Sequence, residues 1–368
     1  MRIAILGTRG IPAAYGGFET FAQELSVRLA AQGVDVTVFC EAGRGAQPSS
    51  FQGVQLRYVA APRLGPLTTL LFDIRCLWSA RSAYDVVYML GYGAGLFCFV
   101  PRLWGSIVWI NMDGVEWARA KWGGAARRWF KVMETMSVRI VDRVIADAEG
   151  IHNHLLARHP HMKPCSVIPY GASIVNEPPD NEPLRAWGLQ PDGFHLVVCR
   201  LEPENRVLEI VRGFQRSEDR YPLIIVGDAN VGGAYVATLK SLSSDRVRFV
   251  GTVYDGDRLR SLRFYARSYF HGHSVGGTNP SLLESLGCGN IVIAHDNVFN
   301  REVAGDLAWY FRTEEDVPPI LESIEALPFP TRQERKQAAM ERVRKLYHWN
   351  DIAERYARLL HETAAQRT

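Results

Sequence analysis

The sequence predicts an α/β protein made of two doubly wound, Rossmann-like domains that face each other across a cleft. Short apolar, β-branched runs alternate with segments of helical period along nearly the whole chain, which is typical of βα units on a parallel sheet. A length of 368 residues suits two domains of ordinary size. A polar, proline-bearing stretch at residues 176–183 separates two such series and is interpreted as a linker.

The first domain is expected to span residues 1–175. Between its first two strands, Phe21, Leu25 and Leu29 recur at helical spacing and predict a helix that buries one face. The predicted strands of this domain are residues 2–6, 34–39, 54–59, 86–90, 106–110, 143–146 and 166–169.

The second domain is expected to span residues 176–345. The remaining residues, 346–368, contain an amphipathic helical pattern and are expected to pack back toward the N-terminal domain. Because ligands of doubly wound sheets bind at the carboxyl ends of the strands, we expect the chemistry in the loops that follow them. The predicted strands of this domain are residues 196–199, 223–226, 247–250, 268–271, 291–294 and 308–311.

Composition excludes several classes of protein. The chain has 42 Lys and Arg against 39 Asp and Glu, with 47% hydrophobic residues, so it is neither disordered nor a polybasic nucleic-acid binder. Only four apolar residues lie between Arg2 and Gly7, too few for the apolar region of a signal peptide. Glycines and a proline interrupt the apolar stretch 86–111, which argues against a spanning helix. We therefore expect a cytoplasmic protein that touches a membrane at most with its surface.

Neither the cysteines nor the histidines predict a metal site. The six cysteines are scattered through apolar surroundings without a C-x-x-C pair, and we expect buried thiols in a reducing compartment. The histidines at 152, 154, 159 and 161 have no clear ligand geometry and are expected in a solvated loop.

The loop after the first strand, residues 7–20, is rich in glycine and leads into a helix. Gly16 and Gly17 allow a ligand to approach the backbone, and the start of the helix offers N–H groups to an anion. The loop is not G-x-G-x-x-G, although the acidic Glu41 follows the second strand, so an NAD site is disfavoured rather than excluded. Turn chemistry alone is the alternative interpretation.

The segment 271–284 carries the strongest pattern. Asn279 suits a helix N-cap and Pro280 suits the first helical position, so the preceding amides should form a cradle for a diphosphate. Glu284 lies one turn into this helix, where its carboxylate can accept hydrogen bonds from sugar hydroxyls. The alternative interpretation is a capped core helix without a ligand, which would explain Asn279 and Pro280 but not the Gly-Gly-Thr segment before them. The cradle consists of Gly276, Gly277, Thr278 and Asn279.

Acidic residues also follow the strand 106–110. Asp113 and Glu116 are expected at its carboxyl end, where Asp113 can orient an acceptor hydroxyl or take its proton. Without this context, an Asp-Gly pair indicates a turn more often than an active-site residue, which is the alternative interpretation of Asp113.

Basic residues alternate with tryptophans over residues 117–131, beginning with Trp117. This mixture suits contact with an anionic bilayer. Stacking on single-stranded nucleic acid and an amphipathic helix packed on the domain core are the alternatives.

Three of these segments, in this order, resemble glycosyltransferase family 4, which has the GT-B fold. They are the glycine-rich first loop, residues 200–205 after the first strand of the second domain, and residues 276–284. More narrowly, residues 7–20 and the segment from Asp113 to Trp122 are similar to the bacterial rhamnosyltransferase branch. That branch transfers L-rhamnose from dTDP-rhamnose to a lipid-diphosphate-linked N-acetylglucosamine during synthesis of cell-surface polysaccharide.

The resemblance implies a role for each matching residue. It makes Asp113, Arg200 and Glu284 the catalytic residues and implies a retaining reaction without a metal or other cofactor. The implied acceptor-binding residues are Tyr15, Asp113, Glu116 and Trp117. The implied donor-binding residues are Gly16, Gly17, Arg200, Arg206, Gly276, Gly277, Thr278, Asn279 and Glu284.

The sequence departs from the family at three positions. Asp113 stands where the family more usually has a histidine, so it is either a substitute for that residue or only a clamp for the acceptor. Gly276 replaces the glutamate that begins the E-x7-E motif, which removes a carboxylate that would contact sugar hydroxyls and suits a 6-deoxy sugar. Asn205 replaces the usual lysine, so Arg200 is the better diphosphate partner and Arg206 the weaker one.

The expected partners are a nucleotide sugar, a lipid-linked sugar acceptor and, through residues 117–131, the inner membrane surface. Nucleic acid is not expected. A UDP- or GDP-sugar as donor, a sugar-nucleotide epimerase and a non-catalytic nucleotide-sugar binding protein are the alternatives.

Overall fold

The computed structural model describes residues 1–13, 16–43, 47–62, 64–119, 122–229 and 233–365. The chain divides into two units: unit 1 comprises Met1–Tyr170 and Trp349–Thr368, and unit 2 comprises Gly171–His348. The first boundary lies at 170 where the sequence analysis placed it at 175, and the second lies at 348 rather than 345.

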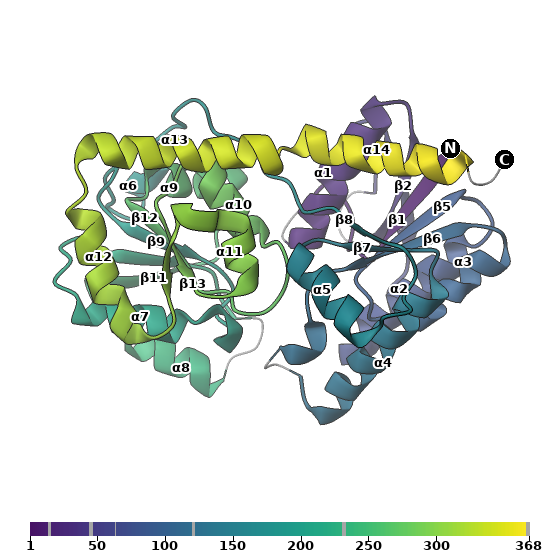
Figure 1. The fold of residues 1–368 in the computed structure, drawn as a ribbon, viewed down its shortest axis with the longest axis horizontal. Coiled ribbons are helices and arrows are strands. Elements are labelled where there is room, and N and C mark those ends of the chain that lie inside the picture. Colours follow the sequence, from purple (N-terminus) through teal and green to yellow (C-terminus); the bar gives the residue numbers. More distant parts are fainter. Residues whose placement is uncertain (14–15, 44–46, 63, 120–121, 230–232, 366–368) are drawn as a thin grey trace. The chain divides into compact units, whose positions relative to one another are not determined.

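The described residues of unit 1 form one eight-stranded sheet in the order β3-β4-β2-β1-β5-β6-β7-β8 (Figure 1). All neighbouring strands pair in parallel except β3 and β4. The strands are β1 (Arg2–Leu6), β2 (Asp35–Glu41), β3 (Ser50–Phe51), β4 (Val54–Val59), β5 (Val86–Leu90), β6 (Ile107–Met112), β7 (Arg143–Ala146) and β8 (Cys165–Val167).

Helices cover both faces of this sheet. Helices α1 and α14 lie on one face, and α2, α3 and α4 lie on the other, while α5 packs on β7 and β8 (Figure 1). The helices are α1 (Gly17–Ala31), α2 (Thr68–Ala80), α3 (Phe99–Leu103), α4 (Gly124–Ile140), α5 (Glu149–Arg158) and α14 (Trp349–Ala365), with the 3-10 turns η1 (Gly65–Leu67), η2 (Gly95–Cys98) and η3 (Glu116–Ala118).

The C-terminal helix α14 is attached to unit 1 through an aromatic cluster. The ring of Phe21, on α1, lies 4.8 Å from that of Tyr170 and 5.9 Å from that of Tyr356 on α14. The hydroxyls of Tyr356 and Tyr88, the latter on β5, are 2.9 Å apart. All these side chains are buried, so α14 completes the core of unit 1 although it is the last element of the chain.

The described residues of unit 2 form a six-stranded sheet in the order β11-β10-β9-β12-β13-β14, with every pair parallel. The strands are β9 (His195–Val198), β10 (Leu223–Val226), β11 (Val247–Gly251), β12 (Ser268–His271), β13 (Val292–His295) and β14 (Trp309–Phe311). The helices are α6 (Glu182–Arg185), α7 (Val207–Arg216), α8 (Ala234–Ser241), α9 (Gly256–Tyr265), α10 (Pro280–Gly287), α11 (Val298–Ala304), α12 (Val317–Glu325) and α13 (Phe329–Leu346), with the 3-10 turns η4 (Pro203–Asn205), η5 (Gly305–Leu307) and η6 (Glu314–Asp316).

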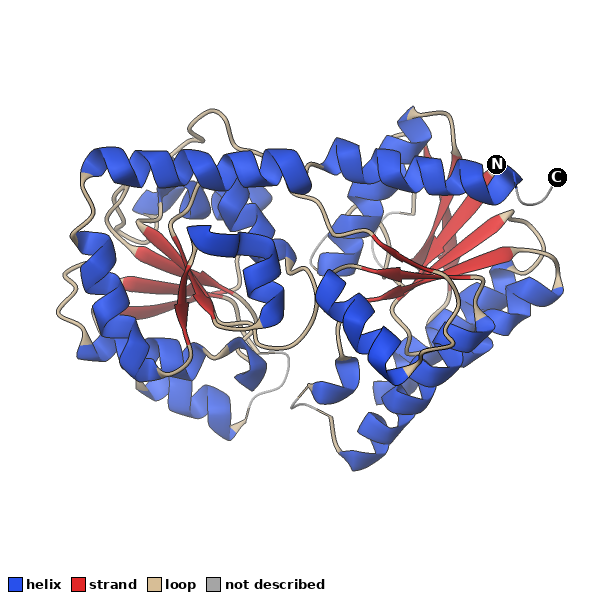
Figure 2. Ribbon diagram, in the orientation of Figure 1, coloured by secondary structure: helices blue, strands red, loops and turns tan. Residues whose placement is uncertain are grey.

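Successive side chains of β10 enter opposite layers of the core. Leu223 and Ile225 pack with residues of α7, α8 and α12, whereas Ile224 and Val226 pack with residues of α6 and α9. A strand buried on both sides needs apolar residues at consecutive positions, which is why this strand is a continuous apolar run. Figure 2 shows the strands of each unit enclosed between helices.

The predicted fold class, an α/β protein with two doubly wound parallel sheets, is confirmed. Every strand predicted from the sequence is present within one or two residues at each end. The short strand β3 was missed. It forms a hairpin with β4 through Gln52 (φ 46°) and Gly53 (φ 84°), and two residues of positive φ are typical of a type I′ turn. A two-residue strand is too short to have a detectable alternation.

The predicted linker 176–183 is part of unit 2. The carbonyl of Pro179 accepts a hydrogen bond from the Tyr265 hydroxyl at 2.6 Å, and that of Asp180 accepts one from Ser261 Oγ at 2.8 Å. Helix α6 then begins at Glu182. The proline-rich composition indicated a connection between domains, but it could not indicate these hydrogen bonds with α9.

Truncation of Phe21 should loosen α14. We expect Phe21→Ala to lower the free energy of unfolding of unit 1 by roughly 3–5 kcal/mol, because it removes the ring at the centre of the aromatic cluster. Urea unfolding followed by tryptophan fluorescence would measure this change, and hydrogen exchange would locate it in α14. Leu64→Ala, which truncates an exposed apolar side chain of the same unit, is the control and should change stability by about 0.5 kcal/mol or less. Equal effects of the two substitutions would contradict the role of Phe21.

Candidate functional site

Two loops meet at the carboxyl edge of the unit 2 sheet. Strands β9 and β12 are parallel neighbours, so their carboxyl ends lie side by side. The loop after β9 contains Arg200 and η4, and the loop after β12 contains the predicted cradle and leads into α10. The sheet thus brings together two segments that are about 70 residues apart in the sequence.

These two loops are locked to each other by their backbones. A Cβ atom on Gly272 would lie 2.0 Å from the carbonyl oxygen of Asn205, so only glycine permits this crossing. The carbonyl oxygen of Glu204 accepts hydrogen bonds from the N–H and the hydroxyl of Ser274, at 2.9 and 2.8 Å. Asn205 Nδ2 donates to the carbonyl oxygen of Arg200 at 2.7 Å. The position of each loop therefore depends on the other.

The predicted helix start is confirmed. Asn279 is the N-cap of α10, where its side chain accepts from the N–H of Ser281 at 3.0 Å, and Pro280 is the first helical residue. Gly276 has a φ of 121°, a conformation that other residues rarely adopt. Gly276, Gly277 and Thr278 are buried.

The two arginines of the first loop differ in their partners. Nη1 of Arg200 is 3.7 Å from Glu202 Oε1, which is too long for a hydrogen bond. Nη1 of Arg206 is 2.8 Å from Glu209 Oε1, so this guanidinium is paired within its own helix. Arg200 is accordingly the better placed of the two to receive an anion.

Glu284 is held by an arginine that the sequence analysis did not identify. Its Oε2 lies 2.7 Å from Nη2 of Arg263 on α9, and Arg263 is only 7% exposed. The same Nη2 lies 3.3 Å from Ser281 Oγ, which is 2.6 Å from the Tyr269 hydroxyl. A buried charge needs a partner, and Arg263 has Glu284 as its partner at the protein surface.

Glu204 and His271 are further polar residues of this edge that the sequence analysis missed. Glu204 is 4% exposed, and neither of its carboxylate oxygens has a hydrogen-bond partner among the described residues. Burial, together with the charge of His295, lowers the pKa of His271 to about 3, so its ring is neutral at pH 7. Both residues lie in segments that the sequence analysis singled out, 200–205 and 271–284, but it assigned no role to either of them.

Asp113 lies at the carboxyl edge of the unit 1 sheet, directly after β6, and Gly114 next to it has a φ of 71°. Burial, and after it the negative charges of Asp113 and Asp147, raises the pKa of Tyr170. The negative charge of Asp113 also contributes, after burial, to the raised pKa of Tyr88. The Asp113 carboxylate is therefore near buried neutral tyrosines, a position the sequence could not reveal.

The other predicted acceptor residues are held by neighbouring side chains. Glu116 Oε1 accepts from Trp122 Nε1 at 2.9 Å, and Glu116 Oε2 is 2.7 Å from Arg119 Nε. The indole N–H of Trp117 donates to Glu134 at 2.7 Å. Glu116 and Trp117 therefore shape the loop after Asp113. Tyr15 lies outside the described residues.

The carboxylate of Glu134 on α4 organises this region, although it is 1% exposed. Besides Trp117, its partners are Arg158 Nε at 2.8 Å and His159 Nε2 at 3.1 Å, while His154 Nε2 lies at 3.6 Å. The predicted solvated histidine loop was therefore wrong: residues 152 and 154 lie on α5, and two of the four histidines face a buried carboxylate.

Gly16 and Gly17 begin α1 in unit 1. Gly16 has a φ of 135°, and a Cβ atom there would lie 2.1 Å from Oε2 of Glu19. The same carboxylate accepts from the N–H of Arg9 at 3.4 Å. The first loop is thus folded back on the helix it precedes, with a glycine where the carboxylate crosses it.

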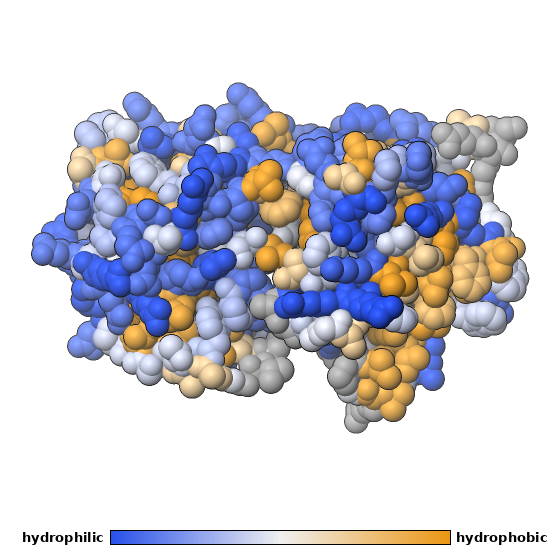
Figure 3. Space-filling view, turned by 60° about the horizontal axis from the view of Figure 1, so that its bottom comes forward, coloured by the Kyte–Doolittle hydropathy of each residue, from blue (hydrophilic) through white to orange (hydrophobic). Residues whose placement is uncertain are grey.

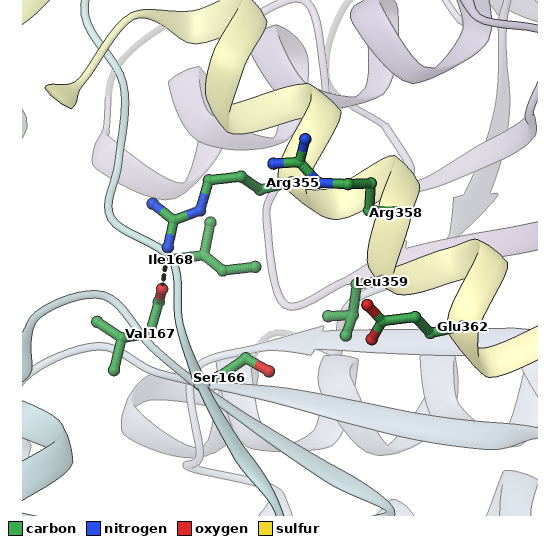
Figure 4. Close-up of a pocket in the computed structure, with 7 residues that line it drawn as sticks. All are labelled: Ser166, Val167, Ile168, Arg355, Arg358, Leu359 and Glu362. Carbon is green, nitrogen blue, oxygen red and sulfur yellow. Dashed lines mark hydrogen bonds between the residues drawn. The ribbon is translucent and has the colours of Figure 1, made fainter. Parts of the chain in front are cut away.

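A pocket of about 210 Å³ lies elsewhere on unit 1, between β8 and α14 (Figure 4). Arg355 donates to the carbonyl oxygen of Val167 at 2.5 Å, and Arg358 and Glu362 line the same pocket. It contains none of the predicted site residues.

The prediction that the cysteines are buried is confirmed for four of the six. Cys165 and Cys199 are only partly buried, so the prediction was wrong for these two. Among the described helices, none is long and apolar enough to cross a bilayer.

Protonation of Glu134 should destabilise unit 1. Burial by itself raises the pKa of this carboxyl, but its hydrogen-bond donors and the charge of Arg158 outweigh burial and lower the pKa to about 2. A depressed pKa stabilises the folded state above the unfolded value of about 4.5, and this contribution is lost as the pH falls toward 2. We expect Glu134→Gln to cost on the order of 3 kcal/mol at pH 7.

Urea unfolding of the wild type and of Glu134→Gln between pH 7 and pH 2.5 would measure this dependence. The gap between the two proteins should narrow below pH 4.5. Glu149→Gln, which alters an acidic residue at the start of α5 that is more exposed to water, is the matched control. A gap that is the same at every pH would refute the depressed pKa.

Comparison with known proteins gives matches to a domain model and to solved structures. A family model described as "Domain of unknown function (DUF1972)" matches residues 1–173. Comparison with curated proteins gives no match.

Three solved structures are similar over nearly the whole chain. Sucrose-phosphate synthase from Thermosynechococcus elongatus has a TM-score of 0.81 and 18% identity and covers 99% of both chains. HepE of Anabaena, in complex with UDP-glucose, has a TM-score of 0.76 and 14% identity, over 98% of this chain and 100% of that one. An α,α-trehalose-phosphate synthase (UDP-forming) from Burkholderia xenovorans has a TM-score of 0.75 and 11% identity, over 97% and 99%. At these identities the likeness establishes the fold, and the chain has the two-domain GT-B fold of these proteins.

Proposed function

We propose that the protein is a glycosyltransferase that moves L-rhamnose from dTDP-β-L-rhamnose to a lipid-diphosphate-linked N-acetylglucosamine, with retention of configuration. The observation that carries the proposal is the convergence of residues 200–206 and 272–279 on one edge of the unit 2 sheet, with Glu284 in the helix that follows. The sequence resemblance supports the choice of rhamnose. The complex of HepE with UDP-glucose supports a nucleotide sugar as donor.

The donor would bind to unit 2 through its diphosphate. Arg200 supplies a cation whose contact with Glu202, at 3.7 Å, is longer than a hydrogen bond. The backbone from Gly276 to Asn279 precedes the N-terminus of α10, where the helix favours negative charge. Glu284 would accept hydrogen bonds from the ribose hydroxyls, oriented by Arg263. Arg206, paired with Glu209, would contribute at longer range.

The reaction breaks the bond between C1 of the sugar and the β-phosphate oxygen and forms a bond from C1 to the acceptor oxygen. Charge develops on the departing dTDP, and Arg200 with the cradle amides would stabilise it without a metal ion. A hydroxyl that attacks from the leaving-group face lies beside the departing phosphate oxygen, which can take its proton. From a β-linked donor this gives a β-linked rhamnoside.

The acceptor would bind to unit 1. Asp113 would orient the attacking hydroxyl, in a loop whose shape depends on Trp117 and Glu134. Tyr15, Gly16 and Gly17 of the first loop complete the proposed acceptor and donor contacts. A lipid-linked acceptor would make this a peripheral protein of the cytoplasmic face of the membrane.

A donor panel tests the proposal. The purified protein would be incubated in EDTA with dTDP-, UDP- and GDP-sugars, with and without the lipid-diphosphate-linked N-acetylglucosamine. We expect acceptor-dependent release of dTDP and a product heavier by one deoxyhexose. Release of nucleotide from a different nucleotide sugar would identify that compound as the donor. Conversion of a nucleotide sugar without the acceptor would indicate an epimerase, and binding without turnover would indicate a non-catalytic binding protein.

Loss of either charged group of the donor site should reduce turnover. We expect Arg200→Ala to lower kcat by about 10² to 10³, because it removes a donor that acts on the leaving-group charge. Glu284→Ala should lower kcat/KM by about 10 to 100-fold through a lost charged hydrogen bond. Arg212→Ala, an exposed arginine of α7, is the control. Wild-type rates in either variant would remove that residue from the proposed site.

Arg263 should act only through Glu284. We expect Arg263→Gln to raise KM for the nucleotide sugar by about tenfold with a smaller change in kcat, because the Glu284 carboxylate loses the group that orients it. Combining Arg263→Gln with Glu284→Ala should add little to Glu284→Ala alone. Arg260→Gln, which alters an exposed arginine of the same helix, serves as the control. Additive effects of the two substitutions would contradict the positioning role.

A further inference from the structure

Large apolar side chains are exposed on the side of unit 1 formed by α2, α3 and α4. Figure 3 shows apolar side chains gathered over this part of the molecule, which lies below the sheet of unit 1 in Figure 1. We call it the aromatic-basic face. Its exposed apolar residues are Trp78 at 53%, Phe99 at 41%, Leu103 at 72%, Trp104 at 50%, Trp129 at 38% and Val132 at 44%.

Two tryptophans and an arginine form the centre of this face. The rings of Trp78, on α2, and Trp104, after α3, meet edge to face with centroids 6.0 Å apart. The guanidinium of Arg81 lies 5.0 Å from the Trp78 centroid and 5.8 Å from that of Trp104. The two rings are thus held together on the surface with a cation stacked on both.

The solvent-exposed side of helix α4 extends the aromatic-basic face. The helix buries Met133 together with residues 134, 137 and 138. Trp129 and Val132 are left exposed. Arg102 of α3 donates to the carbonyl oxygen of Ile140 at 2.6 Å, which joins α3 to the end of α4.

The charges of the face are positive. The three helices contain two carboxylates, Asp73 and Glu134, and both are buried. Burial raises the pKa of Asp73 to about 8, so this carboxyl is mostly uncharged at pH 7. The carboxylate of Glu134 is ionised, and the guanidinium of Arg158 compensates its charge. Asp142, just after α4, is paired with Arg102. The exposed or partly exposed cations are Arg75, Arg81, Arg102, Arg127, Arg128, Lys131 and Arg139.

Exposed tryptophans beside arginines, without exposed carboxylates on the same helices, match the interface of an anionic bilayer. Tryptophan rings prefer the headgroup level, where arginines meet lipid phosphates and long side chains cover apolar surface. A protein partner would have to match a surface that is both apolar and cationic. An anionic bilayer matches both properties at once, because it has an apolar interior and negative headgroups.

We propose that the aromatic-basic face is the surface with which this protein binds an anionic phospholipid bilayer, anchored by Trp78 and Trp104. This moves the main contact away from residues 117–131, whose Trp117 and Trp122 donate their indole N–H groups to internal carboxylates. Only the α4 part of that segment belongs to the face. The inference deepens the proposed function, in which the protein already meets a membrane, by assigning that contact to named residues, and it is tested without any sugar substrate.

Sedimentation of the full chain with vesicles tests the proposal. We expect binding to vesicles of phosphatidylglycerol and phosphatidylcholine, none to phosphatidylcholine alone, and weaker binding as salt is raised. Trp78→Ala with Trp104→Ala should weaken binding on the order of tenfold or more. Arg81→Gln should weaken it about fivefold. Brominated lipids should quench the fluorescence of the wild type more than that of the double variant.

Tyr254→Ala with Phe329→Ala is the matched control, because these aromatic residues of unit 2 are at least as exposed and should not affect binding. Circular dichroism would verify that both double variants are folded, and the Arg81 variant and the salt dependence test the proposal independently of them. The proposal is overturned if the wild type binds neither kind of vesicle, or if the tryptophan double variant binds like the wild type. Vesicle-independent self-association that the double variant abolishes would instead assign the face to a second copy of the chain.

Discussion

In unit 2, β9 pairs in parallel with both β10 and β12, and this pairing determines where chemistry can take place. Parallel strands need crossover connections, and here the crossover helices cover both faces of the sheet. The loops at the carboxyl edge are the part of the sheet left for a ligand. Two glycines make this edge possible, because a Cβ on Gly227 would lie 1.8 Å from the Cys199 carbonyl oxygen and one on Gly272 would meet that of Asn205.

Each unit contains a buried charge that fixes a neighbouring side chain. Arg263 is buried and contacts Glu284 on α10, while Glu134 is buried and holds Trp117 against α4. Loss of Glu284 would leave the Arg263 charge buried without this carboxylate, which is costly, whereas Glu134 also has Arg158 and His159 as partners. Glu204 differs, because its buried oxygens have no hydrogen-bond partner among the described residues.

Tryptophans in unit 1 have two opposite roles. Trp117 and Trp122 donate to carboxylates within the unit and shape the loop after Asp113. Trp78 and Trp104 extend from the unit with Arg81 stacked on them. Both pairs lie near basic residues in the sequence, and composition favoured residues 117–131 as the lipid contact. The tertiary structure decides which indole N–H groups find a carboxylate: Trp117 reaches the buried Glu134 on α4, and Trp122 reaches Glu116.

Local patterns in the sequence determined the strands, the class of fold and the start of α10 at Asn279 and Pro280, because hydrophobic alternation, capping and proline geometry involve residues close together in the chain. The same patterns placed Arg200, Glu284 and Asp113 after strands. Tertiary structure alone decided that Arg263 holds Glu284, that Gly272 is crossed by Asn205, that α14 packs on Phe21, and that Trp78 meets Trp104. These contacts join residues that are 21 or more positions apart in the sequence. Local periodicity cannot predict them, because it does not indicate which distant surfaces come together when helices pack on a sheet.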